Sequence, residues 1–178
     1  MTSPRIIVMS GLPGAGKSTT SHLLGQRLGR SAHVEADRLQ DLIVVGDSHP
    51  TMEGVTDEAT EQLALRLRNA ALLARSFYGA GFTAIIDDII HGHRYEQLMY
   101  DLDGLPVHFV MLLRDLDVMK SIWREMKSPL ADSWDWIDEE IREKTPRGGL
   151  WLDTTHLTID QTVDAIVSRL DEAQLPPQ

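Results

Sequence analysis

The segment Gly11-Leu12-Pro13-Gly14-Ala15-Gly16-Lys17-Ser18 constrains the fold of this chain more than any other, because it spells G-x-x-x-x-G-K-S between two recognisable elements. The apolar run 6–9 before it is typical of a buried strand, and residues 19–28 after it place leucines at helical spacing. A glycine-rich turn in this setting lets successive backbone N–H groups and the positive end of the helix surround a phosphate. A chance glycine-rich turn would not be expected to combine the strand, the helix and the Lys-Ser pair. The sequence therefore predicts a phosphate-binding loop.

Each residue type in this loop has a separate task. The glycines permit backbone angles and a close approach that a Cβ would obstruct. Lys17 supplies a mobile positive charge for the β- and γ-phosphates, and the Ser18 hydroxyl is a ligand for Mg²⁺. ATP and Mg²⁺ are the predicted cofactors, and the predicted nucleotide-binding residues of the loop are Gly11, Leu12, Pro13, Gly14, Ala15, Gly16, Lys17, Ser18 and Thr19.

Composition narrows the classes of protein to which the chain can belong. Its 178 residues are 42% hydrophobic, which suits one core and one domain over residues 1–178. The absence of cysteine excludes disulfides and thiolate chemistry. No leader or membrane-spanning run is visible, so we expect a cytoplasmic protein without a membrane partner. The net charge of −10 and the scattered lysines and arginines argue against a nucleic-acid partner. The sequence leaves the oligomeric state open.

Strand and helix patterns alternate along the whole chain. Five segments are predicted strands: the largely apolar runs 6–9, 82–86, 107–113 and 150–153, and the weaker candidate 32–36. This alternation predicts an α/β protein with a five-stranded parallel sheet covered by helices on both faces. A parallel sheet places ligands at the carboxyl ends of its strands, so polar residues at those positions are candidates for function.

Asp37 follows the second predicted strand and is the candidate general base. It would take a proton from an acceptor hydroxyl, and the alternative is an N-cap for a helix that begins at Arg38. Arg38 itself is a candidate for contact with the substrate.

Asp87 and Asp88 end the third predicted strand. One of two acids at this position can hold Mg²⁺ through water, and the other can orient the acceptor. We assign the first role to Asp87 and the second to Asp88. The alternative is a turn followed by a helix cap. His91 lies close behind and is read as a loop or substrate-facing residue, since no third ligand for zinc is near it.

The remaining candidate cations lie on or after later elements. Arg66, on a long crossover helix that begins near residue 56, is expected to be solvated. Arg114 ends the fourth strand and could contact the base or a phosphate of the nucleotide. Residues of about 115–148 are predicted to form a small helical lid that excludes water, with Arg124 and Lys127 as catalytic cations.

On these residues the chain resembles the small P-loop kinases of the nucleotide-kinase-like group, and within it chloramphenicol phosphotransferase. The resemblance covers the phosphate loop, 34–37, 85–88, Arg114, the helix with Arg124 and Lys127, and 152–156. The loop Gly-Leu-Pro-Gly-Ala is closer to gluconate and shikimate kinases. The resemblance implies phosphate transfer from ATP to an alcohol, with Asp37 as the base and the cations at 124 and 127 on the phosphates.

The predicted function is thus an ATP-dependent kinase whose acceptor is a hydroxyl of a small molecule, either an antibiotic-like compound or a metabolite. Two alternatives remain. Asp37-Arg38 is also similar to polynucleotide kinases, which phosphorylate a 5′-hydroxyl. A regulatory NTPase is the third hypothesis, because residues 101–104 spell D-x-x-G, although there is no N-K-x-D guanine signature.

Overall fold

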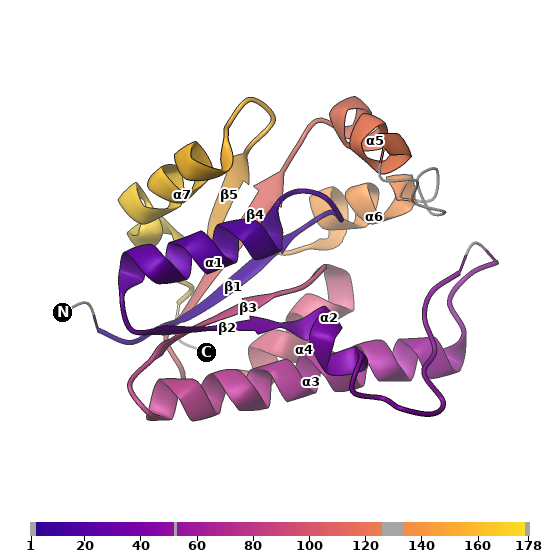
Figure 1. Ribbon diagram of the computed structural model, residues 1–178, viewed down its shortest axis with the longest axis horizontal. Coiled ribbons are helices and arrows are strands. Elements are labelled where there is room, and N and C mark those ends of the chain that lie inside the picture. Colours follow the sequence, from indigo (N-terminus) through magenta and orange to yellow (C-terminus); the bar gives the residue numbers. More distant parts are fainter. Residues whose placement is uncertain (1–2, 52, 126–133, 177–178) are drawn as a thin grey trace.

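The computed structural model describes residues 3–51, 53–125 and 134–176. Within these ranges the chain forms one parallel sheet with helices on both faces (Figure 1). The strands are β1 (Ile6–Gly11), β2 (Ser31–Glu35), β3 (Thr83–Asp87), β4 (Val107–Leu113) and β5 (Leu150–Asp153). The helices are α1 (Lys17–Leu28), α2 (Ala36–Gln40), α3 (Asp57–Gly79), α4 (Gly92–Asp101), α5 (Leu116–Glu125), α6 (Asp135–Glu139) and α7 (Ile159–Ser168), with a π-helical turn at Glu140–Lys144 and a 3₁₀ turn at Leu170–Ala173. The predicted five-stranded α/β fold is confirmed.

The strand order is β2-β3-β1-β4-β5, and every neighbouring pair is parallel. The central strand β1 has Ile6 opposite Ala84 of β3 on one side and Val107 of β4 on the other. All six residues of β1 are buried, since helices cover both faces of the sheet. The strands β2, β3 and β1 therefore lie side by side, and their carboxyl ends meet at the same end of the sheet.

One apolar core lies on each face of the sheet, and alternate residues of β1 contribute to each core. Ile6 and Val8 pack with α3 and α4, whereas Ile7 and Met9 pack with α1 and α7. Figure 1 shows the same division, with α3 and α4 on the lower face and α1 and α7 on the upper one. The run Ile-Ile-Val-Met thus supplies both cores, as expected for a central parallel strand.

Local capping signals set the ends of several helices. The Thr56 side chain accepts a hydrogen bond from the backbone N–H of Ala59 at the start of α3. Thr158 and Gln161 form a capping box at the start of α7. Residues 135–144, within the predicted helical lid, divide into α6 and the π-helical turn.

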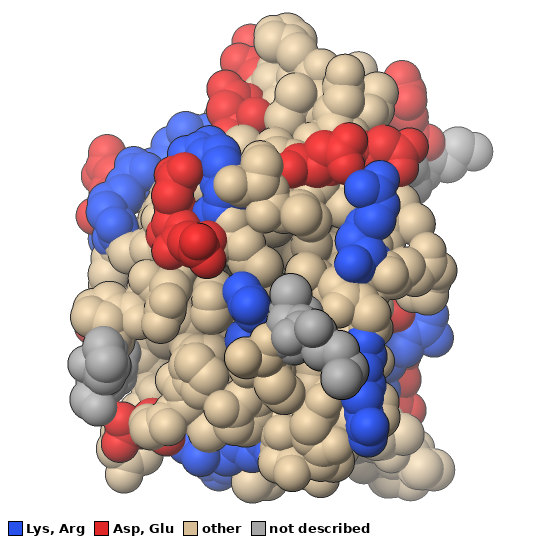
Figure 2. Space-filling model, turned by 90° about the vertical axis from the view of Figure 1, so that its left-hand side faces the viewer, with Lys and Arg blue, Asp and Glu red and all other residues tan. Residues whose placement is uncertain are grey.

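The two ends of the sheet differ in what surrounds them. At the carboxyl end of the strands, α5 with α6 and the segment 41–56 project from the same side of the molecule (Figure 1). The opposite side, which carries the N-terminal end of the described chain, shows Lys and Arg interspersed with Asp and Glu (Figure 2). No helix in the described ranges combines the length and the apolar character that crossing a bilayer requires.

Candidate active site

The phosphate loop lies between β1 and α1, as the sequence predicts. Gly11 has φ 148°, and a Cβ there would lie 2.6 Å from the carbonyl oxygen of Leu112 on the neighbouring strand β4. Gly16 has φ 87°, and its Cβ would lie 2.9 Å from Ile159 at the start of α7. Both positions need glycine for backbone geometry and for space. The glycines therefore allow the loop to turn sharply against β4 and α7.

The α5 helix packs directly on this loop. The indole N–H of Trp123, which is 1% exposed, donates a hydrogen bond of 2.6 Å to the Pro13 carbonyl oxygen. Beside it, Met119 and Ile122 would touch a Cβ placed on Gly14. The loop is thus supported from the side of the predicted lid, a contact that the sequence did not indicate.

Lys17 stands in the first turn of α1 with its ammonium inside the loop. Its Nζ donates to the carbonyl oxygen of Leu12 at 3.1 Å. Burial lowers the pKa of Lys17, and the carboxylates of Asp87, Asp88 and Asp37 act in the opposite direction. Asp37 follows β2, Asp87 ends β3 and Asp88 comes directly after it, and both strands run parallel to β1 in the order β2-β3-β1, so these acids and the loop lie at the same end of the sheet.

Asp37 lies in the first turn of α2, just after β2, and its side chain is 77% exposed. Glu35 is the N-cap residue of α2, so the alternative role of Asp37 as the cap is wrong. Oδ1 of Asp37 lies 2.7 Å from Nη1 of Arg66. The surrounding protein raises the pKa of Asp37, while Arg66 lowers it. A carboxylate at the mouth of the site, in contact with solvent, can accept a proton from a bound hydroxyl.

Asp87 ends β3 and is held by a histidine from the neighbouring strand. Nε2 of His33 lies 2.7 Å from Oδ2 of Asp87, whose side chain is 5% exposed. The register pairs His33 with Ile85, so His33 and Asp87 lie two positions apart on the same face of the sheet. The sequence analysis missed His33, although a histidine inside an edge strand next to a terminal acid is a usable signal.

The site fits magnesium held jointly with a nucleotide. MgATP is expected to bring phosphate oxygens and water as most of the ligands, with one or two protein groups added. The exposed hydroxyl of Ser18 and the remaining oxygen of Asp87 are suitable groups. No cluster of three or more metal-binding side chains exists within the described part of the chain, so the protein residues alone do not form a complete cage.

Asp88 is fully buried and does not face an acceptor, which corrects its predicted role. Its oxygens accept hydrogen bonds from Nη2 of Arg66 at 2.5 Å, Nε of Arg66 at 3.2 Å, Nη2 of Arg94 at 2.9 Å and the backbone N–H of Ile89 at 2.7 Å. The prediction that Arg66 is solvated is also wrong, because its side chain is 8% exposed. Asp88 thus anchors two buried arginines behind Asp37.

Arg38 and His91, the two other candidates for contact with the substrate, pair with Glu35 and Glu140 respectively. Arg38 is exposed and pairs with Glu35 at 2.8 Å. His91 is 6% exposed, with its Nδ1 3.5 Å from Glu140 and its ring edge-on to Trp136. Burial lowers the pKa of His91. It lies in the loop before α4 and packs against α6, so of the two predicted positions it takes the loop and not the substrate-facing one.

The predicted cations of the lid are only partly described. Arg114 follows β4, two residues after Leu112, which pairs with Gly11, and its Nε is buried without a hydrogen-bond partner among the described residues. Such an orphaned donor suits an anionic ligand. Arg124 is exposed on the last turn of α5. Lys127 lies outside the described residues.

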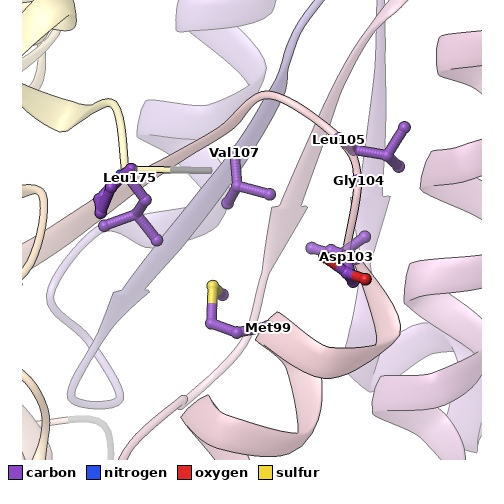
Figure 3. A pocket seen from close by; sticks show the side chains of 8 residues that line it. Met99, Asp103, Gly104, Leu105, Val107 and Leu175 are labelled. Atoms are coloured by element: carbon purple, nitrogen blue, oxygen red, sulfur yellow. The ribbon is translucent and has the colours of Figure 1, made fainter. Parts of the chain in front are cut away.

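The D-x-x-G segment lies at the wrong end of the sheet for a nucleotide switch. Asp103 and Gly104 precede β4. Because β4 runs parallel to β1, they lie at the amino end of the strands, and the phosphate loop lies at the carboxyl end. They line a small pocket of about 20 Å³, room for about one water molecule, together with Met99, Leu105, Val107 and Leu175 (Figure 3). This pocket is separate from the candidate active site.

Comparisons with known proteins agree with this geometry. The model of the Zeta toxin family matches residues 1–76, from β1 into α3. No curated protein matches the chain significantly.

Solved structures match over nearly the whole chain. The tunicamycin resistance protein of Deinococcus radiodurans is 24% identical, with a TM-score of 0.70 and coverage of 98% of this chain and 99% of that one. A sugar kinase from Janibacter sp. HTCC2649 is 23% identical, with a TM-score of 0.67 and 96% of both chains covered. A gluconokinase from Sinorhizobium meliloti 1021 is 17% identical, with a TM-score of 0.67 and coverage of 96% and 94%. The fold of this chain is therefore the α/β fold of the P-loop kinases.

Proposed function

We propose that this protein is an ATP-dependent phosphotransferase that moves the γ-phosphate to a hydroxyl group of a small molecule. The observation that carries the proposal is the placement of Lys17 after β1 and Asp37 after β2 at the carboxyl end of the sheet, with Asp87 at the end of the intervening strand β3. Strands β1 and β2 are two positions apart, or about 10 Å at the usual strand spacing. That interval accommodates a phosphoryl group held by the loop and a hydroxyl held at Asp37.

In the proposed reaction, Asp37 accepts the proton of the acceptor hydroxyl as that oxygen forms a bond to the γ-phosphorus. The bond from the γ-phosphorus to the bridging oxygen breaks, and ADP leaves with that electron pair. Lys17 and the loop N–H groups stabilise the charge on the phosphate oxygens. Bound magnesium supplies further positive charge, for which Ser18 and Asp87 are the proposed holders.

Positive charge on the far side of the phosphates is proposed to come from Arg114, Arg124 and Lys127. The orphaned Nε of Arg114, beside the phosphate loop, is the supporting observation for the first. The segment 115–148 would then act as the lid, and the contact of Trp123 with Pro13 couples its first helix to the loop. The closer resemblance to chloramphenicol phosphotransferase remains a hypothesis about the acceptor.

Two observations weigh against the alternative functions. The chain carries a net charge of −10, which disfavours a polynucleotide acceptor. The D-x-x-G segment lies opposite the phosphate loop, which disfavours a switch.

The test is transfer of labelled γ-phosphate from MgATP across a panel of sugars, nucleosides, antibiotics and a 5′-hydroxyl oligonucleotide. ADP release that rises with one acceptor, together with a phosphorylated product, would support the kinase and identify its substrate class. Lys17→Ala serves as the matched control. Acceptor-independent hydrolysis that prefers GTP, with no phosphorylated product from any compound, would contradict the proposal and favour the NTPase hypothesis.

A further inference from the structure

A buried cluster of charged side chains lies directly behind Asp37. The guanidinium of Arg66, on α3, reaches three partners at once. Its Nη1 is 2.7 Å from Oδ1 of Asp37 and donates to Oε1 of Gln40 at 3.1 Å, while Nη2 and Nε donate to the two oxygens of Asp88. The Arg66 side chain is 8% exposed and that of Asp88 is fully buried.

The position of Arg66 is fixed by rigid elements. Asp88 follows β3, and its second oxygen also binds Arg94 of α4. Gln40, fully buried at the end of α2, donates through Nε2 to the carbonyl oxygen of Ser48 at 2.9 Å. A guanidinium is planar and forms hydrogen bonds at fixed angles, so binding both oxygens of Asp88 sets the direction of Nη1. Arg66 therefore presents Nη1 at a defined point beside α2.

Stability alone does not account for this cluster. Removing two arginines and an aspartate from water costs free energy that their attraction only roughly offsets, and apolar residues of similar size would often stabilise a fold as well. The described cluster has one largely exposed member, Asp37, whose side chain is 77% exposed. An exposed carboxylate would otherwise rotate among several conformations. In this structure one of its oxygens is held.

We infer that Arg66 is the positioning residue of Asp37: it holds Oδ1 so that Oδ2 is left for the acceptor hydroxyl. Oδ2 has no hydrogen-bond partner among the residues that the structure describes. This inference rests on the proposed function, in which Asp37 is the base. Arg66 itself neither gives nor takes a proton in the reaction, and its contribution is the direction and the charge of the carboxylate.

The charges around Asp37 make the inference measurable. Partial desolvation by the surrounding protein and the carboxylates of Asp88 and Asp87 raise the pKa of Asp37, whereas Arg66 and Lys17 lower it. Arg66 is the larger of the two lowering influences. Removal of its charge should therefore raise the pKa of Asp37 further, so that a smaller share of the protein carries the ionised base at a given acidic pH.

The experiment compares Arg66→Met with Arg75→Met. Arg75 is on the same helix, but it donates to the backbone carbonyls of Asp101 and Asp103, away from the site. The titration of Asp37 is followed by carbon NMR of the side-chain carboxyls in the nucleotide-free protein, with Asp37→Asn used to assign the signal. We expect Asp37 to titrate at higher pH in Arg66→Met and as in the wild type in Arg75→Met. The same titration in Arg66→Met and wild type would overturn the inference.

Kinetics give a second, independent readout. In Arg66→Met the acid limb of kcat/KM should move to higher pH, and kcat should fall on the order of 10²-fold because the base is misplaced, with KM for ATP unchanged. If Arg66→Met does not fold, Arg66→Lys replaces it: one ammonium cannot hold both Asp37 and Asp88, so kcat should still fall. An unchanged kcat in Arg66→Lys would overturn the inference. A wild-type protein without transfer activity would refute the proposed function instead, while the NMR titration would still test the Arg66–Asp37 pairing.

Discussion

Asp88→Asn isolates the role of the buried charge cluster in stability. Asp88 is the common acceptor for Arg66 and Arg94, and its side chain has no exposure to solvent. Asparagine has nearly the same shape, so the substitution removes the charge and replaces one accepting oxygen with a donating NH₂ group. That NH₂ group must then face the N–H groups of an arginine.

The expected loss follows from the environment of this carboxylate. Breaking a buried ion pair by neutralising one partner costs about 3–5 kcal/mol, because the other charge stays in the interior without compensation. Typical domains are stable by only about 5–15 kcal/mol. For a chain of this size, the expected fall in Tm is roughly 6–20 °C, at about 2–4 °C per kcal/mol.

The assay is urea unfolding followed by circular dichroism, with Glu172→Gln as the control. Glu172 pairs with Arg169, but both side chains are largely in water, so its removal should change the unfolding free energy very little. A double-mutant cycle with Arg66→Met should show strong non-additivity, since both residues belong to one network. If Asp88→Asn were no more destabilising than Glu172→Gln, the view of this cluster as a desolvated ionic network would be wrong.

The remaining predictions concern the site and one distant histidine. Asp37→Asn should leave ATP affinity near that of the wild type and reduce phosphate transfer by roughly 10²-fold or more, measured as kcat with the labelled nucleotide. Lys17→Ala should abolish productive binding of the triphosphate, measured by fluorescent-nucleotide titration; normal binding would refute the role of the loop. Burial lowers the pKa of His108 below its ordinary 6.5, so the unfolded chain binds the proton more readily and the free energy of unfolding should decline as the pH falls below about 6.5. His108→Gln should flatten that decline in urea titrations. Segment 39–65, which follows Asp37, contains six acids and no Lys or Arg, so a neutral acceptor should react faster than its carboxylate analogue, with the difference shrinking at high salt.

The parts of the fold that the sequence predicted are those set by local patterns. The run 107–113 is a strand with those bounds because six of its seven residues are apolar and it lies in a sheet covered on both faces. The start of α3 follows from the hydroxyl and acids of Thr56-Asp57-Glu58, which satisfy the first backbone N–H groups of a helix. The phosphate loop was readable because its chemistry is contained in eight consecutive residues.

The parts that were missed depend on pairs distant in sequence. Arg66 and Asp88 are 22 residues apart, and only the path from α3 into β3 brings them together. One signal was present: Ala59, Gln62, Arg66 and Ala70 recur at helical spacing and are all buried, so Gln62 and Arg66 belong to the inward stripe of α3. Polar side chains within such a stripe indicate a buried polar network rather than a solvated face.

The difference between Asp87 and Asp88 shows why neighbouring acids need the structure to separate their roles. Successive residues at the end of a strand point to opposite faces, so two adjacent carboxylates cannot share one partner set. Asp87 turns toward His33 on β2, and Asp88 turns toward Arg66 and Arg94 on the helices below. Asp87 is therefore a candidate ligand for magnesium, whereas Asp88 binds two arginines, one of which contacts the candidate base Asp37. The alternation of side chains along the strand determines which of the two adjacent acids has which role.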